Sequence, residues 1–567
     1  MIRNKLNCLT LAGCMAVLTV SVANAQRSKL ASDLKLADPE ATVDVIVQFK
    51  QQPSVAHHAR MLRQGGQMKA ELRAVRGGAY SLRAASLAEL ADDPDVLYIS
   101  PDRKVSGALD NTAAAVNAPI AWAAGRTGSG VGVAVIDSGI SNHEDLAKNG
   151  KRIVYSQDFI GGGTDDHHGH GQHVAGIIAG DGTDSATTST RTFKGIAPGA
   201  NLLNLRVLDQ NGQGTDSGVI AAINSAIQLK SQYNIRVINL SVGRPVFESY
   251  TVDPLCQAVE AAWKAGIVVV AAAGNNGRDN SAGTNGYGTI TAPGNDPYVI
   301  TVGAMKTMGT PQRSDDLIAS YSSKGPTMID HVVKPDLVAP GNKVVSLLAS
   351  TAQLTQSHPQ NNVPLSYYQS TNQTNASNLY FTLSGTSMAA PVVSGAAALM
   401  IQAYPNLTPD QVKARLMHTA SKSFPVSSVA TDPVTGKAYS SQYDVFTVGA
   451  GYLDVAAALA DRTVFTGTAQ SPVAVRNSQT NVTSMVCPAA SICGSQSLWD
   501  NQSLWGTQSL WDNQTLWDNS FFLKGTQSLW DTQSLWGTQS LWGTQSLWGV
   551  STTNAVEMET IAINGEK

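Results

Sequence analysis

The chain has 567 residues, 43% of them hydrophobic, which allows two or three domains with a large buried core. Only 14% of the residues are charged and the net charge is −3, so the composition indicates no polyanionic partner and no nucleic acid.

Residues 1–25 have the pattern of a secretory signal peptide. A basic start and an apolar stretch that ends at Val22 precede the small-residue cleavage site Ala23-Asn24-Ala25. Leu11-Ala12-Gly13-Cys14 offers an alternative, because it resembles a lipoprotein box that would acylate Cys14. We favour cleavage after Ala25, since the apolar stretch continues well past Cys14. The chain is therefore predicted to be secreted, extracellular or periplasmic, and we expect no later run to be long enough to span a bilayer.

Residues 26–107 are predicted to form a small unit of their own. Apolar and polar residues alternate in its expected strands, and polar amphipathic segments separate them. The expected strands are residues 43–49, 79–84 and 96–100, and the expected helices are residues 57–75 and 86–92. This order predicts a small α+β sandwich.

From residue 131 to residue 304, apolar strands alternate with helical segments. The expected strands are residues 132–136, 201–208, 236–242, 267–273 and 299–302, and the expected helices are residues 216–230 and 254–264. Continuous Val, Ile and Leu runs are typical of strands that are buried on both faces. The sequence therefore predicts an α/β fold with a parallel sheet between helix layers.

The first candidate functional residues lie at a strand end and at a helix start. Asp137 follows an apolar strand, at the edge where clefts form in open α/β sheets. Four histidines within seven residues come later, and His170 opens a helix of small residues. Zinc is an alternative for this cluster, since His170 and His173 share a helix face. We favour a buried structural role for His173 and loop positions for His167 and His168, because no cysteine or HExxH pattern accompanies them.

Another apolar strand ends in Gly274-Asn275-Asn276-Gly277. Taken alone, Asn-Gly after a strand is usually a turn. If a nucleophile lies nearby, the side-chain amide of Asn275 would be able to donate a hydrogen bond to an oxyanion.

The nucleophile is predicted in the stretch Ser384-Gly385-Thr386-Ser387-Met388-Ala389-Ala390-Pro391, which enters an apolar helix. Ser387 would lie in the first turn, where unpaired backbone N–H groups and the helix dipole favour negative charge. The alternative is a tight helix entry with Ser387 as an ordinary cap. A serine needs a base and a group that orients the base. His170 and Asp137 are the candidates for these two roles.

The order Asp, His, Ser along the chain is the order found in subtilisin. The chain resembles the subtilisin-like serine proteases, the subtilases of peptidase family S8, over about residues 108–462. The resemblance is carried by Asp137-Ser138-Gly139, His170-Gly171-Gln172-His173-Val174-Ala175-Gly176, Ala273-Gly274-Asn275 and Gly385-Thr386-Ser387-Met388-Ala389-Ala390-Pro391. Lesser signatures match at residues 322–326, 334–341 and 449–454. Gln172 departs from the usual threonine of the family, but it points away from the catalytic ring.

The resemblance implies a secreted serine endopeptidase made as a zymogen. Ser387 would attack, His170 would be general base and acid, Asp137 would orient His170, and Asn275 would serve the oxyanion hole. Residues 26–107 look like the inhibitor-type propeptide of subtilases, with a permanent accessory domain as the alternative. Matching implies these substrate-binding residues: Gly212, Gly214, Leu240, Ser241, Val242, Gly243, Ala273 and Gly274. Ala272, Ala273 and Gly274, with Thr291 and Gly294 opposite, would form the S1 wall. This small, uncharged lining favours an apolar or aromatic P1 residue, and the alternative is that the glycines serve turns only.

The chemistry implied by the resemblance requires no cofactor, and we assign no metal site. Subtilases commonly bind structural calcium, but residues 181–189 do not match the usual ligand pattern. Asp181 and Asp184 are candidate oxygen ligands, with a solvated polar loop as the alternative.

Residues 463–567 are predicted to be an extension outside the catalytic unit, so that a chain ending at 463 should keep its catalytic core. Hexad repeats fill residues 497–549, and their even period places every Trp on one face of an extended chain. The tail is thus expected to be a small β-solenoid or stacked short strands, with low-complexity disorder as the alternative. It would bind a surface or pack on the enzyme.

Cys487 and Cys493 are close enough in sequence to bridge, and Cys256 is expected to be buried and free. The second function considered is a catalytically silent surface-binding protein that uses the Trp hexads for adhesion. We favour the enzyme, because a silent relative would be expected to have lost Asp137, His170 or Ser387, and all three are present.

Overall fold

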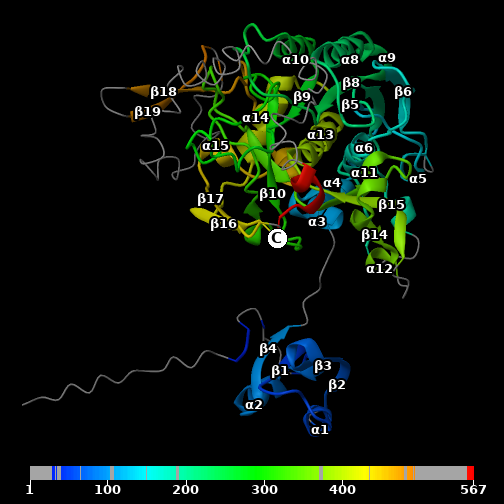
Figure 1. The fold of residues 1–567 in the computed structure, drawn as a ribbon, viewed down its shortest axis with the longest axis vertical. Helices are drawn as coiled ribbons and strands as arrows, with labels where there is room; N and C mark the ends of the chain where they lie inside the picture. Colours follow the sequence, from blue (N-terminus) through cyan, green and yellow to red (C-terminus); the bar gives the residue numbers. More distant parts are fainter. Residues whose placement is uncertain are drawn as a thin grey trace, which may run out of the picture. The chain divides into compact units, whose positions relative to one another are not determined.

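The computed structural model describes residues 29–31, 34, 40–63, 65–101, 108–147, 150–186, 191–369, 375–432, 435–477, 482–489, 491 and 559–566. The expected signal peptide and the Trp hexads lie outside these residues. The chain divides into two compact units, Met1–Val105 and Ser106–Lys567, which are described separately (Figure 1).

The first unit is a four-stranded antiparallel sheet with two helices. The strand order is β2 (Gln67–Leu72), β3 (Gly77–Arg83), β1 (Thr42–Phe49) and β4 (Val96–Pro101), and the helices are α1 (Val55–Arg63) and α2 (Ser86–Asp92). Every second residue of β1 is buried from Val45 onward, so one face of the sheet carries the core of this unit.

The single helix expected at residues 57–75 is wrong. Helix α1 ends at Arg63, and β2 and a short 3₁₀ turn, η1 (Arg73–Val75), follow it. The backbone N–H groups of Gly65 and Gly66 donate to the carbonyls of Leu62 and Met61, and Gly65 has a φ of +77°. These are the bonds of a Schellman helix end, which glycine favours because it has no Cβ.

The second unit contains a mixed, mostly parallel eight-stranded sheet. Seven strands follow the order β11 (Leu317–Ile318), β10 (Ile300–Lys306), β9 (Val268–Ala272), β8 (Ile235–Leu240), β5 (Gly132–Asp137), β7 (Asn201–Arg206) and β6 (Ile153–Asp158), and β12 (Leu337–Pro340) also pairs with β10. All pairs are parallel except that of β10 with β11. The predicted α/β fold with a sheet between helices is confirmed.

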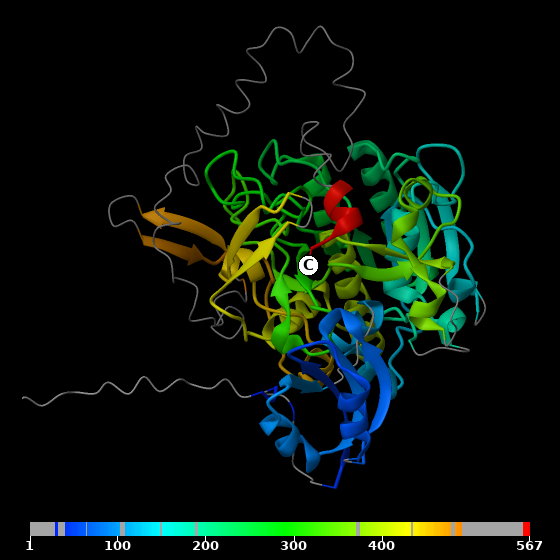
Figure 2. The same cartoon turned by 60° about the horizontal axis from the view of Figure 1, so that its bottom comes forward.

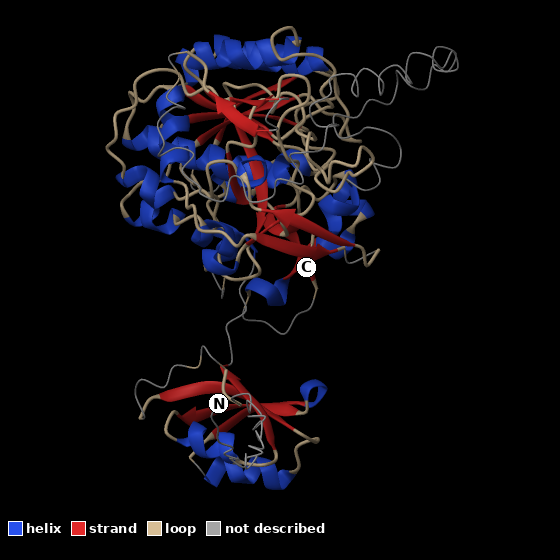
Figure 3. Ribbon diagram, turned by 90° about the vertical axis from the view of Figure 1, so that its left-hand side faces the viewer, coloured by secondary structure: helices blue, strands red, loops and turns tan. Residues whose placement is uncertain are grey.

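Two pairs of long helices pack against this sheet: α6 (His170–Ala179) with α13 (Thr386–Ala403), and α8 (Asp216–Gln228) with α10 (Pro254–Lys264). Figure 3 shows helices on both sides of the strands. Strands β5, β9 and β10 are buried along their whole length, as continuous apolar runs predict.

Shorter elements complete the second unit. The helices are α3 (Ala108–Ala115), α4 (Ala118–Ala123), α5 (Glu144–Ala147), α7 (Thr183–Ala186), α9 (Lys230–Tyr233), α11 (Gln353–Ser357), α12 (Leu365–Tyr368), α14 (Pro409–Thr419), α15 (Val445–Val448) and α16 (Val455–Ala460), with 3₁₀ turns η2 (Arg313–Asp315) and η3 (Pro359–Asn361). The strands form a sheet in the order β13 (Val344–Leu347), β15 (Ala376–Leu383) and β14 (Asn362–Pro364), and the hairpins β16 (Ser427–Thr431) with β17 (Ala438–Gln442) and β18 (Val473–Asn477) with β19 (Val482–Val486).

Helix α13 corrects the expectation that no later run is long enough to span a bilayer. Its 18 residues have a mean hydropathy of 1.3, so length and composition alone would allow a span. However, 89% of the helix is buried within the protein, as expected for a core helix.

Some of the described residues after 462 also belong to the packed core. Phe465 and Ala474 join a buried cluster with Met417 and Phe446. Ile561, near the C-terminus, joins the main core of the second unit. Figure 2 shows the C-terminal turn in red against this unit. The expected boundary at 462 therefore falls between residues that share buried clusters, and the retention of the catalytic core by a chain ending at 463 stays a prediction.

Two cysteine expectations fall in this unit. Cys256 is free and completely buried in α10, where its thiol donates to Asn295 Oδ1 at 3.3 Å. Cys487 is disulfide-bonded. Cys493 lies outside the described residues.

Candidate active site

Three predicted side chains lie at the ends of core elements. Asp137 is the last residue of β5, His170 is the first residue of α6, and Ser387 is the second residue of α13. Helix α6 packs against both β5 and α13. The three residues are only 1%, 2% and 4% exposed, so water has little access to them.

Asp137 and His170 are joined by a hydrogen bond of 2.7 Å between Oδ1 and Nδ1. The same carboxylate oxygen accepts the backbone N–H of Ser138 at 2.8 Å. A carboxylate beside Nδ1 favours the tautomer that carries its proton there. The other ring nitrogen, Nε2, is then the basic one.

Ser387 and Ser241 are joined by two hydrogen bonds. The Ser387 hydroxyl donates to the carbonyl of Ser241 at 3.1 Å, and the Ser241 hydroxyl donates to the carbonyl of Ser387 at 2.8 Å. Ser241 follows β8 directly. These two bonds connect the end of the central strand to the first turn of α13.

Asn275 is fixed in orientation by Thr386. Its Oδ1 accepts the backbone N–H of Thr386 at 2.9 Å and the Thr386 hydroxyl at 3.1 Å. The side-chain NH₂ is therefore the end of the amide that is available as a donor to a ligand. A Cβ on Gly385, whose φ is +145°, would lie 3.2 Å from Nδ2 of Asn275. Glycine at 385 keeps space beside this donor.

Asp166 is a functional residue that the sequence analysis left without a role. Its carboxylate accepts the backbone N–H groups of His168, Gly169 and Gln172 at 2.7–3.0 Å, and the Ser138 hydroxyl at 2.8 Å. Burial raises the pKa of this carboxyl. Asp166 thus connects the start of α6 to the loop after Asp137. Asp166 lies four residues before the first residue of α6, and its bond to the Gln172 N–H reaches the first turn, although Gly169 occupies the N-cap position.

The other histidines of the cluster have separate positions. His173 is fully buried, its Nε2 lies 3.0 Å from the Val344 carbonyl, and burial lowers its pKa to about 3. His167 lies in the loop and is exposed, while His168 lies in the same loop and is buried. Among the described residues, the one group placed for metal binding does not include this cluster. Gln172 turns its side-chain oxygen to the backbone N–H of Ser141 at 2.8 Å.

The expected substrate-binding residues lie near strand ends. Gly212 is in a turn that its N–H closes on the Asp209 carbonyl at 3.1 Å. Partly exposed backbone is found at Gly214, Gly243 and Gly274, whereas the following side chains are buried: Leu240, Ser241, Val242 and Ala273. Residues 213–215 and 241–243 belong to no named strand.

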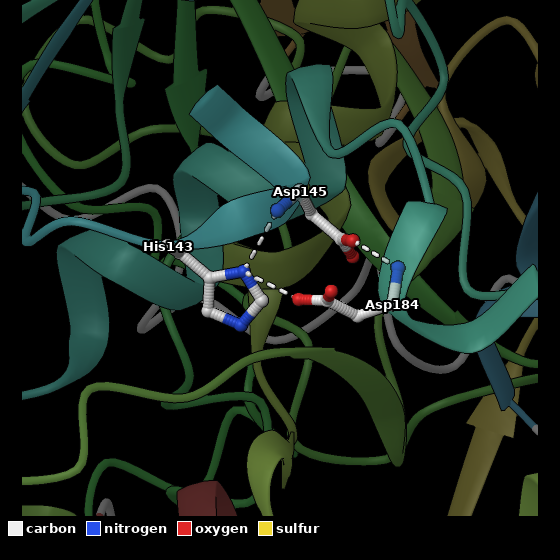
Figure 4. Close-up of side chains that lie close together, drawn as sticks. All are labelled: His143, Asp145 and Asp184. Atoms are coloured by element: carbon white, nitrogen blue, oxygen red, sulfur yellow. Dashed lines mark hydrogen bonds and ion pairs between the residues drawn. The ribbon is translucent and has the colours of Figure 1, made fainter. Parts of the chain in front are cut away.

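One group of side chains outside this site has the spacing of metal ligands. His143, Asp145 and Asp184 point toward one another (Figure 4). The Asp145 carboxylate accepts the backbone N–H of Asp184 at 2.8 Å and the Tyr380 hydroxyl at 2.8 Å, and His143 Nδ1 accepts the Asp145 N–H at 3.1 Å.

This group fits structural calcium poorly. Calcium prefers six to eight oxygen ligands. The group offers one nitrogen and two carboxylates, and protein donors already use His143 Nδ1 and the Asp145 carboxylate. Burial lowers the pKa of His143 and raises that of Asp145. Of the two expected oxygen ligands, Asp184 belongs to this group and Asp181 does not. We therefore assign no calcium site.

Comparisons with known proteins agree on one family. The model of the subtilase family matches residues 128–451. Serine protease AprX of Bacillus subtilis (strain 168) is 36% identical over 342 residues, which are 59% of this chain and 71% of the relative. Subtilisin E of the same organism is 34% identical over 384 residues, which are 66% of this chain and 84% of the relative. The crystal structure of a cold-adapted subtilisin-like serine proteinase is 30% identical, covers 52% of this chain and 84% of that chain, and aligns with a TM-score of 0.37.

Proposed function

The chain belongs to the subtilase family and is a serine endopeptidase, and we propose that it is a secreted zymogen that acts through Asp137, His170, Ser387 and Asn275. The observation that carries this assignment is the hydrogen bond of 2.7 Å between Asp137 and His170, at the start of the helix that packs on α13. This is the base and orienting pair that a serine nucleophile needs.

In the first half of the reaction, Ser387 Oγ bonds to the scissile carbonyl carbon and its proton passes to His170 Nε2. Asp137 keeps the ring in the correct tautomer and stabilises the imidazolium. The C–N bond then breaks, and His170 gives the proton to the departing amine. Water repeats the same steps on the acyl-enzyme and releases the acid.

The negative oxygen of the tetrahedral intermediate needs donors that are already in place. Asn275 Nδ2 is one, because Thr386 fixes the amide oxygen on its other side. The backbone N–H of Ser387 is the second, since N–H groups in the first turn of a helix lack intrahelical partners. The N-terminal dipole of α13 favours the same charge.

The substrate chain would bind as an added strand along residues 212–215 and 240–243. Backbone hydrogen bonds of this kind give affinity with few demands on side chains. The partly exposed Gly214 and Gly243 support this reading, because a glycine lets another backbone approach closely. Ala273 and Gly274, with little side-chain volume, would admit an apolar or aromatic P1 residue.

Secretion and zymogen maturation rest on the N-terminal sequence. Residues 1–25 have the pattern of a signal peptide, and the first compact unit ends at Val105. A separate folded unit ahead of the peptidase suits a propeptide that assists folding and inhibits the active site until it is cleaved.

The test is Ser387→Ala, with Ser231→Ala on the exposed surface of α9 as the matched control. Ser387→Ala should lower peptide hydrolysis on the order of 10⁶-fold, the loss known for a subtilisin nucleophile, and should leave the melting temperature nearly unchanged. Ser231→Ala should behave as wild type. Hydrolysis by Ser387→Ala at the wild-type rate would refute the assignment. A wild-type protein that hydrolyses no peptide but binds a surface would favour the silent adhesion protein.

A further inference from the structure

The last described residues form a short segment that is bound into the second unit. We call residues 559–566 the C-terminal clasp. Its residues 559–564 form a helical turn, from which Ile561 and Ile563 reach into the main core. Its last member, Glu566, is a carboxylate that is only 1% exposed.

The Glu566 side chain lies between two cations. Oε1 is 2.6 Å from Arg278 Nη2, and Oε2 is 3.2 Å from Lys306 Nζ. The backbone N–H of Ser320 donates to both carboxylate oxygens, at 3.0 and 3.1 Å. Burial alone would raise the pKa of Glu566, but the charges of Lys306 and Arg278 and the bonds from Ser320 hold this pKa below its ordinary value.

Arg278 connects this carboxylate to the segment that follows Asn275. It is three residues after Asn275, and Ser320 Oγ accepts its Nε at 2.8 Å. The other terminal nitrogen, Nη1, donates to a second carboxylate, that of Asp432, at 2.6 Å. Each of the three guanidinium nitrogens of Arg278 therefore has a hydrogen-bond acceptor, and Glu566 supplies one of them.

The clasp backbone connects to the loop of the nucleophile. The carbonyl of Ala562 accepts the backbone N–H of Ser384, three residues before Ser387, at 2.9 Å. Asn342 bonds both backbone groups of Glu566: its Nδ2 donates to the carbonyl at 3.0 Å and its Oδ1 accepts the N–H at 2.8 Å. A Cβ on Gly565, whose φ is +58°, would lie 2.5 Å from Ser384 Oγ.

We propose that the C-terminal clasp is a positioning element of the active site, and that Glu566 is its positioning residue. The clasp forms hydrogen bonds both to the segment that leads to Ser387 and to the segment that follows Asn275. It therefore fixes these two loops relative to each other. This inference rests on the proposed roles of Ser387 and Asn275. It makes efficient turnover depend on a segment about 170 residues beyond the nucleophile in sequence.

The expected effect falls on kcat more than on KM. A misplacement of about 1 Å between reacting groups costs about 10²-fold in rate. Residues 212–215 and 240–243, which would bind the substrate chain, lie on other loops, and none of the clasp contacts described above reaches them. Loss of the clasp should therefore spare substrate binding.

The experiment uses the full chain with three substitutions. Glu566→Gln keeps the volume of the side chain but removes its charge. Glu559→Gln makes the same change at the exposed start of the clasp, where Glu559 contacts only His358 among the described residues, at 3.1 Å. Gly565→Ala leaves every charge in place and pushes a methyl group toward Ser384. For each protein we would measure kcat and KM on a small peptide, the fraction of serine that reacts with a covalent serine-directed inhibitor, and the melting temperature.

The inference predicts that kcat per reactive serine falls at least tenfold in Glu566→Gln, with KM within threefold of wild type and Glu559→Gln unchanged. If Glu566→Gln does not fold, Gly565→Ala decides by the same criterion. A lower melting temperature with wild-type kcat per reactive serine would overturn the inference and make the clasp purely structural. Wild-type protein that neither hydrolyses the peptide nor reacts with the inhibitor would instead refute the proposed function, and the inference with it.

Discussion

At the scale of single residues, the contacts around Asn275 define the orientation of the proposed oxyanion donor. Thr386 supplies two donors to Asn275 Oδ1, so the amide has one orientation, with its NH₂ available. Such a donor is useful because it needs no reorganisation when the charge develops.

Asn275→Leu should lower kcat about 10²–10³-fold with little change in KM, because leucine has a similar volume and no donor; this is the range known for loss of such a donor in a subtilisin. Steady-state kinetics on a small peptide would measure it. A change confined to KM would instead make Asn275 a substrate-binding residue.

A second residue, Asp316, gives a prediction for pH. Burial raises its pKa to about 7, and Tyr452 donates to its Oδ2 at 2.6 Å. Between pH 4 and pH 7 the unfolded chain therefore carries the charge while the folded protein keeps the proton. Stability is lost as the pH rises through this window, because the unfolded state binds fewer protons.

Asp316→Asn removes this titration. The difference in unfolding free energy between the variant and wild type should grow in favour of the variant by about 3 kcal/mol from pH 4.5 to pH 8. Urea unfolding at the two pH values measures it. Glu248→Gln, at an exposed position whose charge does not act on Asp316, is the control and should show no such trend. A constant difference for Asp316→Asn would mean that Asp316 is ionised in the folded protein throughout.

At the scale of elements, the starts of α6 and α13 determine where the proposed catalytic residues His170 and Ser387 lie. Asp166 gathers three backbone N–H groups at the entry to α6 and accepts the Ser138 hydroxyl next to Asp137. We therefore expect the position of His170 to depend on Asp166, a residue to which the proposed mechanism gives no chemical step.

Asp166→Ala leaves these donors without their acceptor in a buried site. It should lower the unfolding free energy by at least about 1–3 kcal/mol and should lower kcat as well, since His170 is the first residue of α6. Denaturant unfolding and peptide hydrolysis measure the two effects. Asp165→Ala, one residue earlier and exposed, is the control. Equal stability of the two variants would rule out a stabilising role of Asp166 at the entry to this helix.

The sequence predicted those helices whose start and end signals lie within or next to the helix itself. Helices α2 and α10 begin and end where the sequence indicates, and Asp253 caps α10 before Pro254. The helix expected at residues 57–75 is wrong because Met68 and Leu72 of β2 are spaced four residues apart, which also suits one face of a helix, whereas Gly65 and Gly66 end α1 at Arg63. The contacts of Glu566 were beyond prediction, because they join residues 246 and 288 positions apart in the chain.

At the scale of the whole molecule, the chain consists of two compact units that divide at residues 105 and 106, and its C-terminus is part of the second unit. The first unit has a complete small core of its own, formed by residues from β1, β3, β4 and both helices. A separately folded segment of this kind is well suited to removal by a single cut.

If the enzyme cuts its own propeptide, wild-type protein should lose about residues 26–107 during expression, while Ser387→Ala should retain them. Intact-mass analysis and N-terminal sequencing of both purified proteins measure this. Equal processing of the two would point to another protease, and retention by an active wild type would make the first unit a permanent domain.

The most direct test of the central claim is to identify the residue that a covalent serine-directed inhibitor modifies. Peptide mapping by mass spectrometry after treatment of the full chain should find one adduct, on Ser387. His170→Ala should abolish this labelling, because the hydroxyl loses the base that takes its proton. An adduct on a different serine, or full labelling of Ser387 in His170→Ala, would contradict the account.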